Sequence, residues 1–290
     1  MYIDKFGKTR QKVGLHLHTT LSDGRKTPEE VVQIYKNAGY DAIALTDHWY
    51  FGKACEIDGM SIISGAEYNL DGIDGVVSGT YHILGLFMDD EPRGLTKTDH
   101  PQKVIDELHR IGALVVLAHP AWSLNMPDNI MALSGIDATE IYNTVSAVGE
   151  SFRPDSSVIV DVLAGNGYNY PLLATDDAHY YNGEDDCVSY IMVECESTDH
   201  NELKKAILEG RFYASQGPEI HLTREGDKFR VDCSPVQKIY FSSNIAWWRR
   251  STKGDGITSA EYTPSPIDKF VRAFVIDENG KMAWSNIEMI

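Results

Sequence analysis

The sequence predicts an α/β fold for most of the chain, followed by a small all-β region. In the first 215 residues, short apolar runs alternate with helix-like segments, the pattern of a mostly parallel sheet covered by helices. Several of these apolar runs end in a histidine or a carboxylate. After Gly217-Pro218 no helical stripe is present, and short alternating stretches are separated by turn residues. These observations predict two domains, residues 1–215 and 216–290.

Four segments have the composition of helices. In the first, 27–39, Thr27 is a capping residue, Pro28 occupies the first helical position, and Gly39 ends the helix. The other three helices are predicted at 101–112, 155–165 and 201–210. The strands of the first domain are predicted at 13–18, 41–47, 61–67, 81–87, 113–119, 137–142, 170–176 and 189–194. Those of the second are predicted at 219–222, 229–232, 238–242, 270–277 and 282–285.

Charge and length narrow the classes of partner. The 290 residues include 43 acidic and 26 basic side chains, a formal net charge of −17. This charge repels a phosphate backbone at long range, so we expect no nucleic-acid polymer as a partner. A small anionic substrate remains compatible with it, because divalent cations in a pocket reverse the sign of the charge locally.

The sequence also predicts the cellular compartment of the protein. No segment resembles a secretory signal, and none approaches the roughly 18 apolar residues of a membrane-spanning helix. Four scattered cysteines without a CxxC pair argue against a disulfide framework and a thiolate zinc site. We therefore expect a cytoplasmic protein without a membrane partner, and the sequence leaves its oligomeric state open.

Residues that can bind metal follow the predicted strands. Carboxyl ends of parallel strands share one face of a barrel, so residues far apart in the sequence would meet there. These residues are His16, His18, His48, Glu67, His119, Asp176 or Asp177, and His179. With His82 they include six of the ten histidines. Imidazole and carboxylate without thiolate is a ligand set for Zn²⁺, Mn²⁺ or Fe²⁺, and the number of candidates predicts two or three ions.

Seven motifs in order resemble the polymerase-and-histidinol-phosphatase (PHP) family over roughly residues 13–215. They are His16-Leu17-His18, Ser22-Asp23-Gly24, Leu45-Thr46-Asp47-His48, Gly65-Ala66-Glu67, His82-Ile83-Leu84-Gly85, Ala118-His119-Pro120 and Asp177-Ala178-His179. The resemblance implies a distorted (β/α)₇, TIM-like barrel that holds two or three metal ions. The residues after Gly217 would then form a small C-terminal all-β appendage.

The resemblance also implies a role for each candidate ligand. His16 and His18 would bind one ion, with Asp177 near it and Glu67 bridging it to a second ion. His82 and His119 would complete the shell of the second ion. Asp23, His48 and His179 would hold a third. Spacing to His179 favours Asp177 over Asp176, and His82 lies early in its apolar run, so its assignment rests mainly on the resemblance.

The expected activity is metal-dependent hydrolysis of a small phosphorylated substrate. The attacking group would be a hydroxide that bridges the ions and is held by Glu67 and Asp177. The chain has no GxSxG elbow and no Walker loop, which agrees with direct attack. A phosphoester also requires a positive clamp, for which Arg153 and Arg211 are candidates, and Tyr142 is a candidate for lining the pocket.

The sequence leaves two alternative functions open. Segments 174–179, 210–215 and 283–286 resemble a branch that includes carbaryl-hydrolase-like proteins, so carboxylic or carbamate esters, or amides, are alternative substrates. The other alternative is a non-catalytic metal-binding module whose β region recruits a partner. The sequence does not distinguish Mn, Zn and Fe as the metal.

Overall fold

The computed structural model describes residues 2–70, 80–148, 151–246 and 250–290. Its helices are α1 (Pro28–Asn37), α2 (Pro101–Arg110), α3 (Pro127–Met131), α4 (Ser157–Gly165) and α5 (His200–Leu208), with a 3₁₀ turn at Val145–Ala147. The strands up to the middle of the chain are β1 (Tyr2–Ile3), β2 (Thr9–Gly14), β3 (Ala42–Ala44), β4 (Cys55–Ile57), β5 (Met60–Ile63), β6 (Gly65–Leu70), β7 (Tyr81–Leu86), β8 (Leu114–Leu117) and β9 (Ala138–Asn143). The later strands are β10 (Leu172–Thr175), β11 (Tyr190–Glu194), β12 (Phe212–Ser215), β13 (Ile220–Glu225), β14 (Lys228–Ser242), β15 (Ser251–Tyr262), β16 (Phe270–Ile276), β17 (Met282–Trp284) and β18 (Glu288–Met289).

The first helix forms as its sequence predicts. The Thr27 hydroxyl accepts a hydrogen bond from the Glu30 backbone N–H at 3.3 Å, and the Glu30 carboxylate accepts one from the Thr27 N–H at 2.9 Å. This capping box satisfies two of the N–H groups that a helix start leaves unpaired. The predicted helices at 101–112, 155–165 and 201–210 are also present as α2, α4 and α5. The five-residue α3 was not predicted, because one turn is too short to show a helical period.

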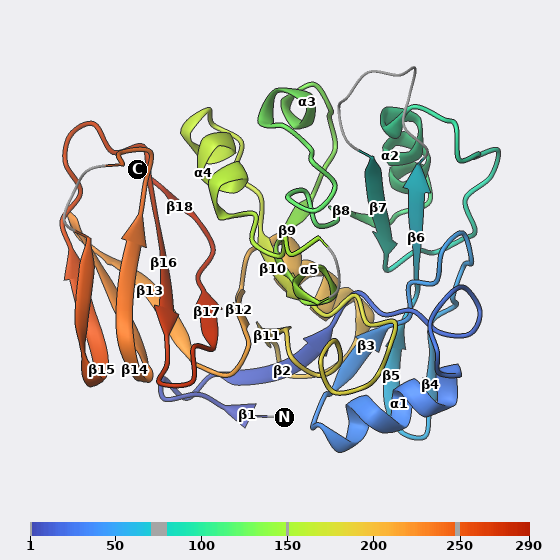
Figure 1. Cartoon of the computed structure of the whole chain (residues 1–290), viewed down its shortest axis with the longest axis horizontal. Helices are drawn as coiled ribbons and strands as arrows, with labels where there is room; N and C mark the ends of the chain where they lie inside the picture. Colours follow the sequence, from blue (N-terminus) through green and yellow to red (C-terminus); the bar gives the residue numbers. More distant parts are fainter. Residues whose placement is uncertain (1, 71–79, 149–150, 247–249) are drawn as a thin grey trace.

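The described strands form two hydrogen-bonded sheets rather than one closed barrel (Figure 1). One sheet has the order β10-β9-β8-β7-β6, and β2, β3, β5 and β11 belong to the other. The sheets meet where their strands end, through isolated bridges between Leu17 and Ala178 and between His48 and Glu67. At these points the described residues form isolated bridges and not a continuous ladder, so the expected closed (β/α)₇ ring is not seen among them.

The prediction of a mostly parallel sheet is wrong for β11, which is antiparallel to both β2 and β12, and for β7. Strand β7 runs antiparallel to both of its neighbours, β6 and β8. Its first residues therefore lie beside the last residues of β6, and His82 pairs with Asn69 in the ladder. An antiparallel strand brings its beginning to the edge where parallel strands end. This explains why His82, early in its apolar run, shares an edge with residues that follow other strands.

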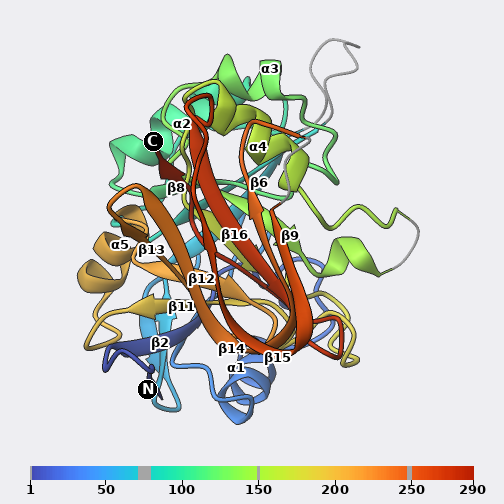
Figure 2. The same cartoon turned by 90° about the vertical axis from the view of Figure 1, so that its left-hand side faces the viewer.

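A β-rich region follows β12 (Figure 2). All pairings of β13–β18 are antiparallel, and β17 pairs with β12, so these strands extend the sheet that contains β2. The two stretches predicted at 229–232 and 238–242 are one strand, β14, whose register with β15 shifts between them. Strand β15 was not predicted, since it is exposed on both faces and shows no alternation. The predicted boundary at residues 215 and 216 falls between β12 and β13.

Apolar side chains fill the space between the sheets and under the helices. The largest buried cluster combines residues of β2, β3 and β7–β12 with residues of α4 and α5, and extends to Trp284 of β17. A second cluster lies between α2 and the strands β6–β8, and a third lies within the β-rich region. Among the described residues, no helix is long and apolar enough to cross a membrane.

Candidate metal centre

Most of the predicted ligands lie just beyond regular strands, whereas Glu67 lies within β6 and His82 within β7. His16 and His18 come just after β2, and the chain there runs beside the segment that follows β10. The Asp177 N–H donates to the His16 carbonyl at 2.9 Å, and the His18 N–H donates to the Ala178 carbonyl at 3.0 Å. These backbone bonds hold two distant parts of the sequence together. Both imidazoles are completely buried.

The structure brings all nine predicted ligands together in three adjoining clusters. Within each cluster, one potential ligand atom from every member lies within 4.8 Å of those of the others. The clusters are His16, His18, Glu67 and Asp177; Glu67, His82 and His119; and His18, Asp23, His48 and His179. The first shares Glu67 with the second and His18 with the third. This arrangement suits a centre of several ions that share ligands.

Glu67 is the point at which the histidines converge. Its Oε2 lies 3.3 Å from His16 Nε2 and 3.1 Å from His18 Nε2. The same oxygen lies 3.1 Å from His48 Nδ1, and Oε1 lies 2.7 Å from His82 Nδ1. A single carboxylate with two oxygens facing separate groups of imidazoles has the geometry of a bridging ligand.

Several buried polar atoms at this centre lack any hydrogen-bond partner. They are His16 Nε2, His18 Nε2, His48 Nδ1 and Asp177 Oδ1. Buried polar atoms are almost always paired with protein, water or an ion, so four orphans around one point indicate a missing common partner. Imidazole nitrogens and carboxylate oxygens in this arrangement fit a divalent cation, and the residues present therefore fit the metals expected from the sequence.

The structure distinguishes the two neighbouring aspartates. Asp177 Oδ1 lies 3.1 Å from His18 Nε2 and 3.2 Å from His16 Nε2. Asp176 faces elsewhere and accepts hydrogen bonds from the Tyr35 hydroxyl at 2.6 Å and the Ser189 N–H at 2.7 Å. Burial raises the pKa of the Asp176 carboxyl to about 7. Asp177 is the aspartate that faces the histidines.

Backbone strain accompanies two of these residues. His119 has a φ of 28° and Asp177 a φ of 53°, in the left-handed region that residues with a β-carbon seldom adopt. Such strain tends to occur at functional sites, where the surrounding structure enforces it. Gly24 lies in the loop that carries Asp23. A glycine is required there, because a β-carbon would lie 2.3 Å from the His18 carbonyl oxygen.

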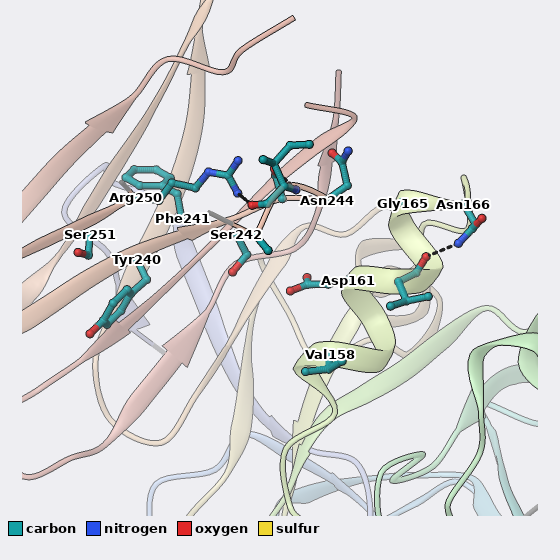
Figure 3. Close-up of a pocket in the computed structure, with 14 residues that line it drawn as sticks. Val158, Asp161, Gly165, Asn166, Tyr240, Phe241, Ser242, Asn244, Arg250 and Ser251 are labelled. Atoms are coloured by element: carbon teal, nitrogen blue, oxygen red, sulfur yellow. Dashed lines mark hydrogen bonds between the residues drawn. The ribbon is translucent and has the colours of Figure 1, made fainter. Parts of the chain in front are cut away.

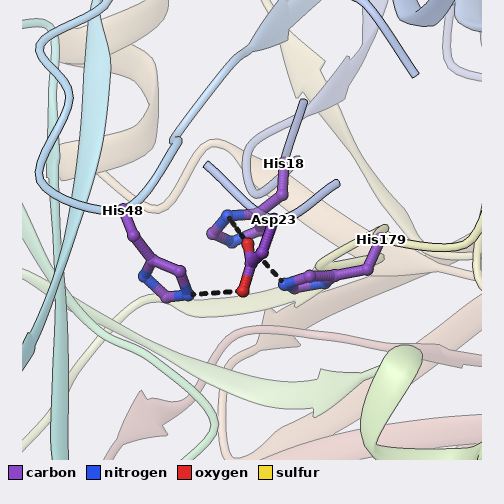
Figure 4. Close-up of side chains that lie close together, drawn as sticks. All are labelled: His18, Asp23, His48 and His179. Carbon is purple, nitrogen blue, oxygen red and sulfur yellow. Dashed lines mark ion pairs between the residues drawn. The ribbon is translucent and has the colours of Figure 1, made fainter. Parts of the chain in front are cut away.

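The third cluster is the one nearest the solvent. Figure 4 shows Asp23 between the rings of His18, His48 and His179. Its Oδ1 lies 3.4 Å from His179 Nε2, and its Oδ2 lies 3.7 Å from His48 Nε2. The Asp23 side chain is 57% exposed, whereas that of His18 is completely buried. An ion at this cluster would face the open side of the pocket.

The buried carboxylates and imidazoles of the centre shift one another's pKa values. Burial acts to raise the pKa of Glu67, but the facing imidazoles of His16 and His82 outweigh it and hold that pKa well below its usual range. Burial acts to lower the pKa of His18, but the facing carboxylates of Asp177 and Glu67 raise it to about 9. The site thus favours anionic carboxylates, whose charge bound cations would balance when the imidazoles are neutral.

Two further carboxylates that the sequence did not single out hold this centre in place. Glu140 of β9 is fully buried and its Oε1 lies 2.8 Å from His16 Nδ1. Asp47 accepts hydrogen bonds from the Thr19 N–H at 2.7 Å and the Ser22 hydroxyl at 2.7 Å. Glu140 is a charged residue within an otherwise apolar and neutral strand, which is the one feature of the sequence that could have drawn attention to it.

A pocket of about 720 Å³ opens over the centre. It is lined by Asp23, His48, Glu67, His82, His119, Asp177 and His179, together with Trp122, Val145, Ser146, Val148, Ser151 and Tyr180. Its volume is within the usual range of small-molecule sites. The described residues that line it include four histidines but no lysine or arginine.

The predicted substrate-binding residues lie outside this lining. Arg211 pairs with Glu209, at 2.8 Å, and donates to the Glu194 carbonyl at 2.6 Å. Arg153 is exposed, and its backbone N–H donates to Ser146. The Tyr142 ring packs against Trp284, with ring centroids 5.3 Å apart. The structure therefore does not bring these three residues together with the predicted ligands.

A second hollow of about 660 Å³ lies between α4 and strands β14 and β15 (Figure 3). It contains none of the predicted ligands. Asp161, which lines it, already binds Arg272 through two hydrogen bonds of 2.6 and 3.0 Å. We therefore place the candidate chemistry in the pocket over the histidines.

Comparison with known proteins agrees with this geometry. The model of the PHP domain matches residues 14–180. The uncharacterized protein MJ1587 of Methanocaldococcus jannaschii is 24% identical over 152 residues, covering 46% of this chain and 81% of that protein. A crystal structure from Bacteroides vulgatus, described as a two-domain protein containing a predicted PHP-like metal-dependent phosphoesterase, is similar across 98% of this chain and 95% of that one, with a TM-score of 0.54 and 15% identity. This likeness shows a shared fold across both the α/β part and the β-rich region.

Proposed function

Because this chain belongs to the PHP domain family, whose model matches more than half of its length, we propose that it is a metal-dependent phosphoesterase that acts on a small phosphorylated substrate. The observation that carries the proposal is the set of four buried, unpartnered ligand atoms facing one point beneath a pocket. Divalent ions bound there would polarise the phosphoryl group and lower the pKa of a coordinated water. We expect two or three ions of Mn, Zn or Fe, with the nine clustered residues as ligands.

The chain's own groups would orient the reaction. Glu67 and Asp177 place carboxylate oxygens on the same imidazole nitrogen, His18 Nε2, each at 3.1 Å. Carboxylates so placed accept hydrogen bonds from a water molecule and orient it toward a phosphorus atom in the pocket. His179 and Asp23 stand at the open side, where the leaving group would depart.

A positive group at the rim favours a phosphoester over a neutral ester. The Arg25 guanidinium lies 4.6 Å from the ring centroid of Tyr180, which lines the pocket. Among the described residues no carboxylate pairs with the Arg25 side chain, so its five N–H donors are available to an anion. We propose Arg25, rather than Arg153 or Arg211, as the clamp for phosphate oxygens.

The alternative activity is hydrolysis of carboxylic or carbamate esters or amides at the same centre, as in the carbaryl-hydrolase-like branch. The apolar side chains of Trp122, Val145 and Val148 line the pocket and would accept an uncharged leaving group. This observation favours the alternative activity. Under either activity we expect a small-molecule substrate, since the net charge of −17 opposes nucleic-acid polymers. We also expect a cytoplasmic protein.

The two activities are separated by a matched pair of chromogenic substrates. The purified protein, loaded with Mn²⁺, is assayed on 4-nitrophenyl phosphate and on 4-nitrophenyl acetate, with inorganic phosphate as the inhibitor. The proposal predicts turnover of the phosphate ester and competitive inhibition by phosphate. Turnover of the acetate alone, without inhibition by phosphate, would favour the alternative.

A further inference from the structure

The carboxylate of Glu140 contacts two of the predicted metal ligands, His16 and His119, from behind. It lies on β9 beneath the histidines, and its side chain is completely buried. Its Oε1 lies 2.8 Å from His16 Nδ1 and accepts a hydrogen bond from the Thr175 hydroxyl at 2.8 Å. Its Oε2 accepts hydrogen bonds from the His119 backbone N–H and the Asn143 amide, both at 2.9 Å. Both oxygens therefore face hydrogen-bond donors.

These contacts reach three of the predicted ligands. His16 is held through its ring and His119 through its backbone, at the residue whose φ is 28°. Asn143 also donates from its amide to Asp177 Oδ2 at 3.1 Å, so one side chain joins Glu140 to a third ligand. No hydrogen bond in the described structure joins Glu140 to His18, Asp23, His48 or His179. Glu140 thus touches two of the three clusters and not the solvent-facing one.

The contact with His16 fixes the position of a proton. A carboxylate only accepts hydrogen bonds, so the proton of the neutral imidazole must sit on Nδ1. That leaves Nε2 with a free lone pair, and Nε2 is one of the orphaned atoms that face Glu67 and Asp177. Histidines that bind metal are commonly set in this way by a carboxylate behind the ring.

We propose that Glu140 is a positioning residue that sets the metal affinity of the clusters containing His16 and His119. The inference rests on the proposed metal centre and adds a determinant of its affinity. A glutamine at position 140 would keep the length of the side chain but exchange one acceptor oxygen for a donor NH₂. Turned toward His16, the NH₂ would put the imidazole proton on Nε2, where it blocks a cation. Turned the other way, it would face the His119 N–H.

The test is metal binding by the full-length protein, measured without turnover. Metal-free wild type and Glu140→Gln are titrated with Mn²⁺ by calorimetry, and bound metal is counted after gel filtration. We expect Glu140→Gln to weaken part of the sites by about 10- to 100-fold, as loss of such a carboxylate commonly does, and to leave the remaining site unchanged. Thr175→Val, which removes a single donor to Oε1, should shift the same sites by a smaller factor.

The control is Asp268→Asn in the β-rich region. Asp268 is also a buried carboxylate with several donors, including Tyr262 at 2.7 Å and Arg250 at 2.9 Å, but it touches no predicted ligand. It should leave metal affinity unchanged, and melting curves in EDTA show how far each variant is destabilised. Equal metal binding by wild type, Glu140→Gln and Thr175→Val would overturn the inference and leave the proposed function standing. Wild type without metal would overturn both.

Discussion

Glu67 Oε2 and His18 Nε2 lie 3.1 Å apart, and this pair joins all three clusters of the centre. His18 belongs to the first and third clusters, and Glu67 belongs to the first and second. Both side chains are essentially inaccessible to solvent. The pair is therefore the structural link through which ions in adjoining positions would share ligands.

Replacing Glu67 should remove the shared ligand with little change of volume. We predict that Glu67→Gln lowers kcat/KM on an aryl phosphate by at least about 100-fold, or about 2.7 kcal/mol of transition-state stabilisation, because an amide is a poor bridging ligand. The measurement is steady-state kinetics with parallel metal analysis. Glu107→Gln is the control and should retain wild-type kinetics, because Glu107 of α2 pairs with Arg110 and is not among the clustered residues. A fully active Glu67→Gln would contradict the bridging role.

Removal of metal should destabilise the fold. Without ions the carboxylates and imidazoles of the centre stay buried with orphaned atoms, whereas ions bind the folded chain alone. Metal present at 100 times its dissociation constant adds about 2.7 kcal/mol, so chelation should lower the Tm by on the order of 5–10 °C. Differential scanning calorimetry with EDTA, then with excess Mn²⁺, measures the change. An unchanged Tm in both conditions would argue against ions bound at the buried clusters.

The guanidinium at the pocket rim should affect substrate binding more than stability. Loss of a charge-assisted hydrogen bond costs about 1.5–3 kcal/mol, so Arg25→Gln should raise KM for a phosphoester by on the order of 10-fold or more. KM for a neutral ester should not change. Arg211→Gln and Arg153→Gln are the matched comparisons, and we expect neither to alter KM. A larger effect at Arg211 or Arg153 than at Arg25 would reverse this assignment.

The stability of the β-rich region should depend on pH through the carboxyl group of Asp268. Burial acts to raise the pKa of this carboxyl, but hydrogen bonds from Ser243, Tyr262 and Ser265 outweigh it and hold the pKa below its usual value. A depressed folded-state pKa gives stability that is present above the unfolded pKa and is lost as the pH falls through the folded value. Asp268→Asn should therefore reduce the free energy of unfolding at neutral pH by about 1–3 kcal/mol.

The same variant should also flatten the pH dependence on the acid side. Urea unfolding of wild type and Asp268→Asn between pH 3 and 7, both in EDTA, compares the two. The difference between the variants should shrink as the pH is lowered. A difference that is constant over this range would mean that the charge of Asp268 does not stabilise the fold.

Much of the α/β part was predictable because its local patterns are strong. The capping box of α1 and the apolar stripes of α2 and α5 each depend on about ten consecutive residues. All three helices form where predicted. Strand direction is not local. An apolar run such as Tyr81–Leu86 has the same composition in either direction, so the antiparallel placement of β7 could not be deduced from periodicity.

The site also combines residues that local patterns predict with residues whose role depends on the folded structure. The spacing of His16 and His18 and the position of Glu67 after a strand predicted residues that the structure does bring together. Glu140 stands out only as the one charged residue of its strand, and its role depends on Asn143, Thr175 and His119 meeting around it in three dimensions. The candidate clamps Arg153 and Arg211 both lie in the second half of the chain. Arg25, which we propose instead, comes near the pocket because its backbone N–H donates to the His179 carbonyl at 2.8 Å.

The most direct test of the metal centre is elemental analysis of freshly purified protein, combined with turnover of an aryl phosphate in the presence of Mn²⁺. We predict two or three ions per chain, with both the ions and the activity lost in His16→Ala. Protein that contains no metal, takes up none on addition, and hydrolyses no phosphate ester would contradict this prediction.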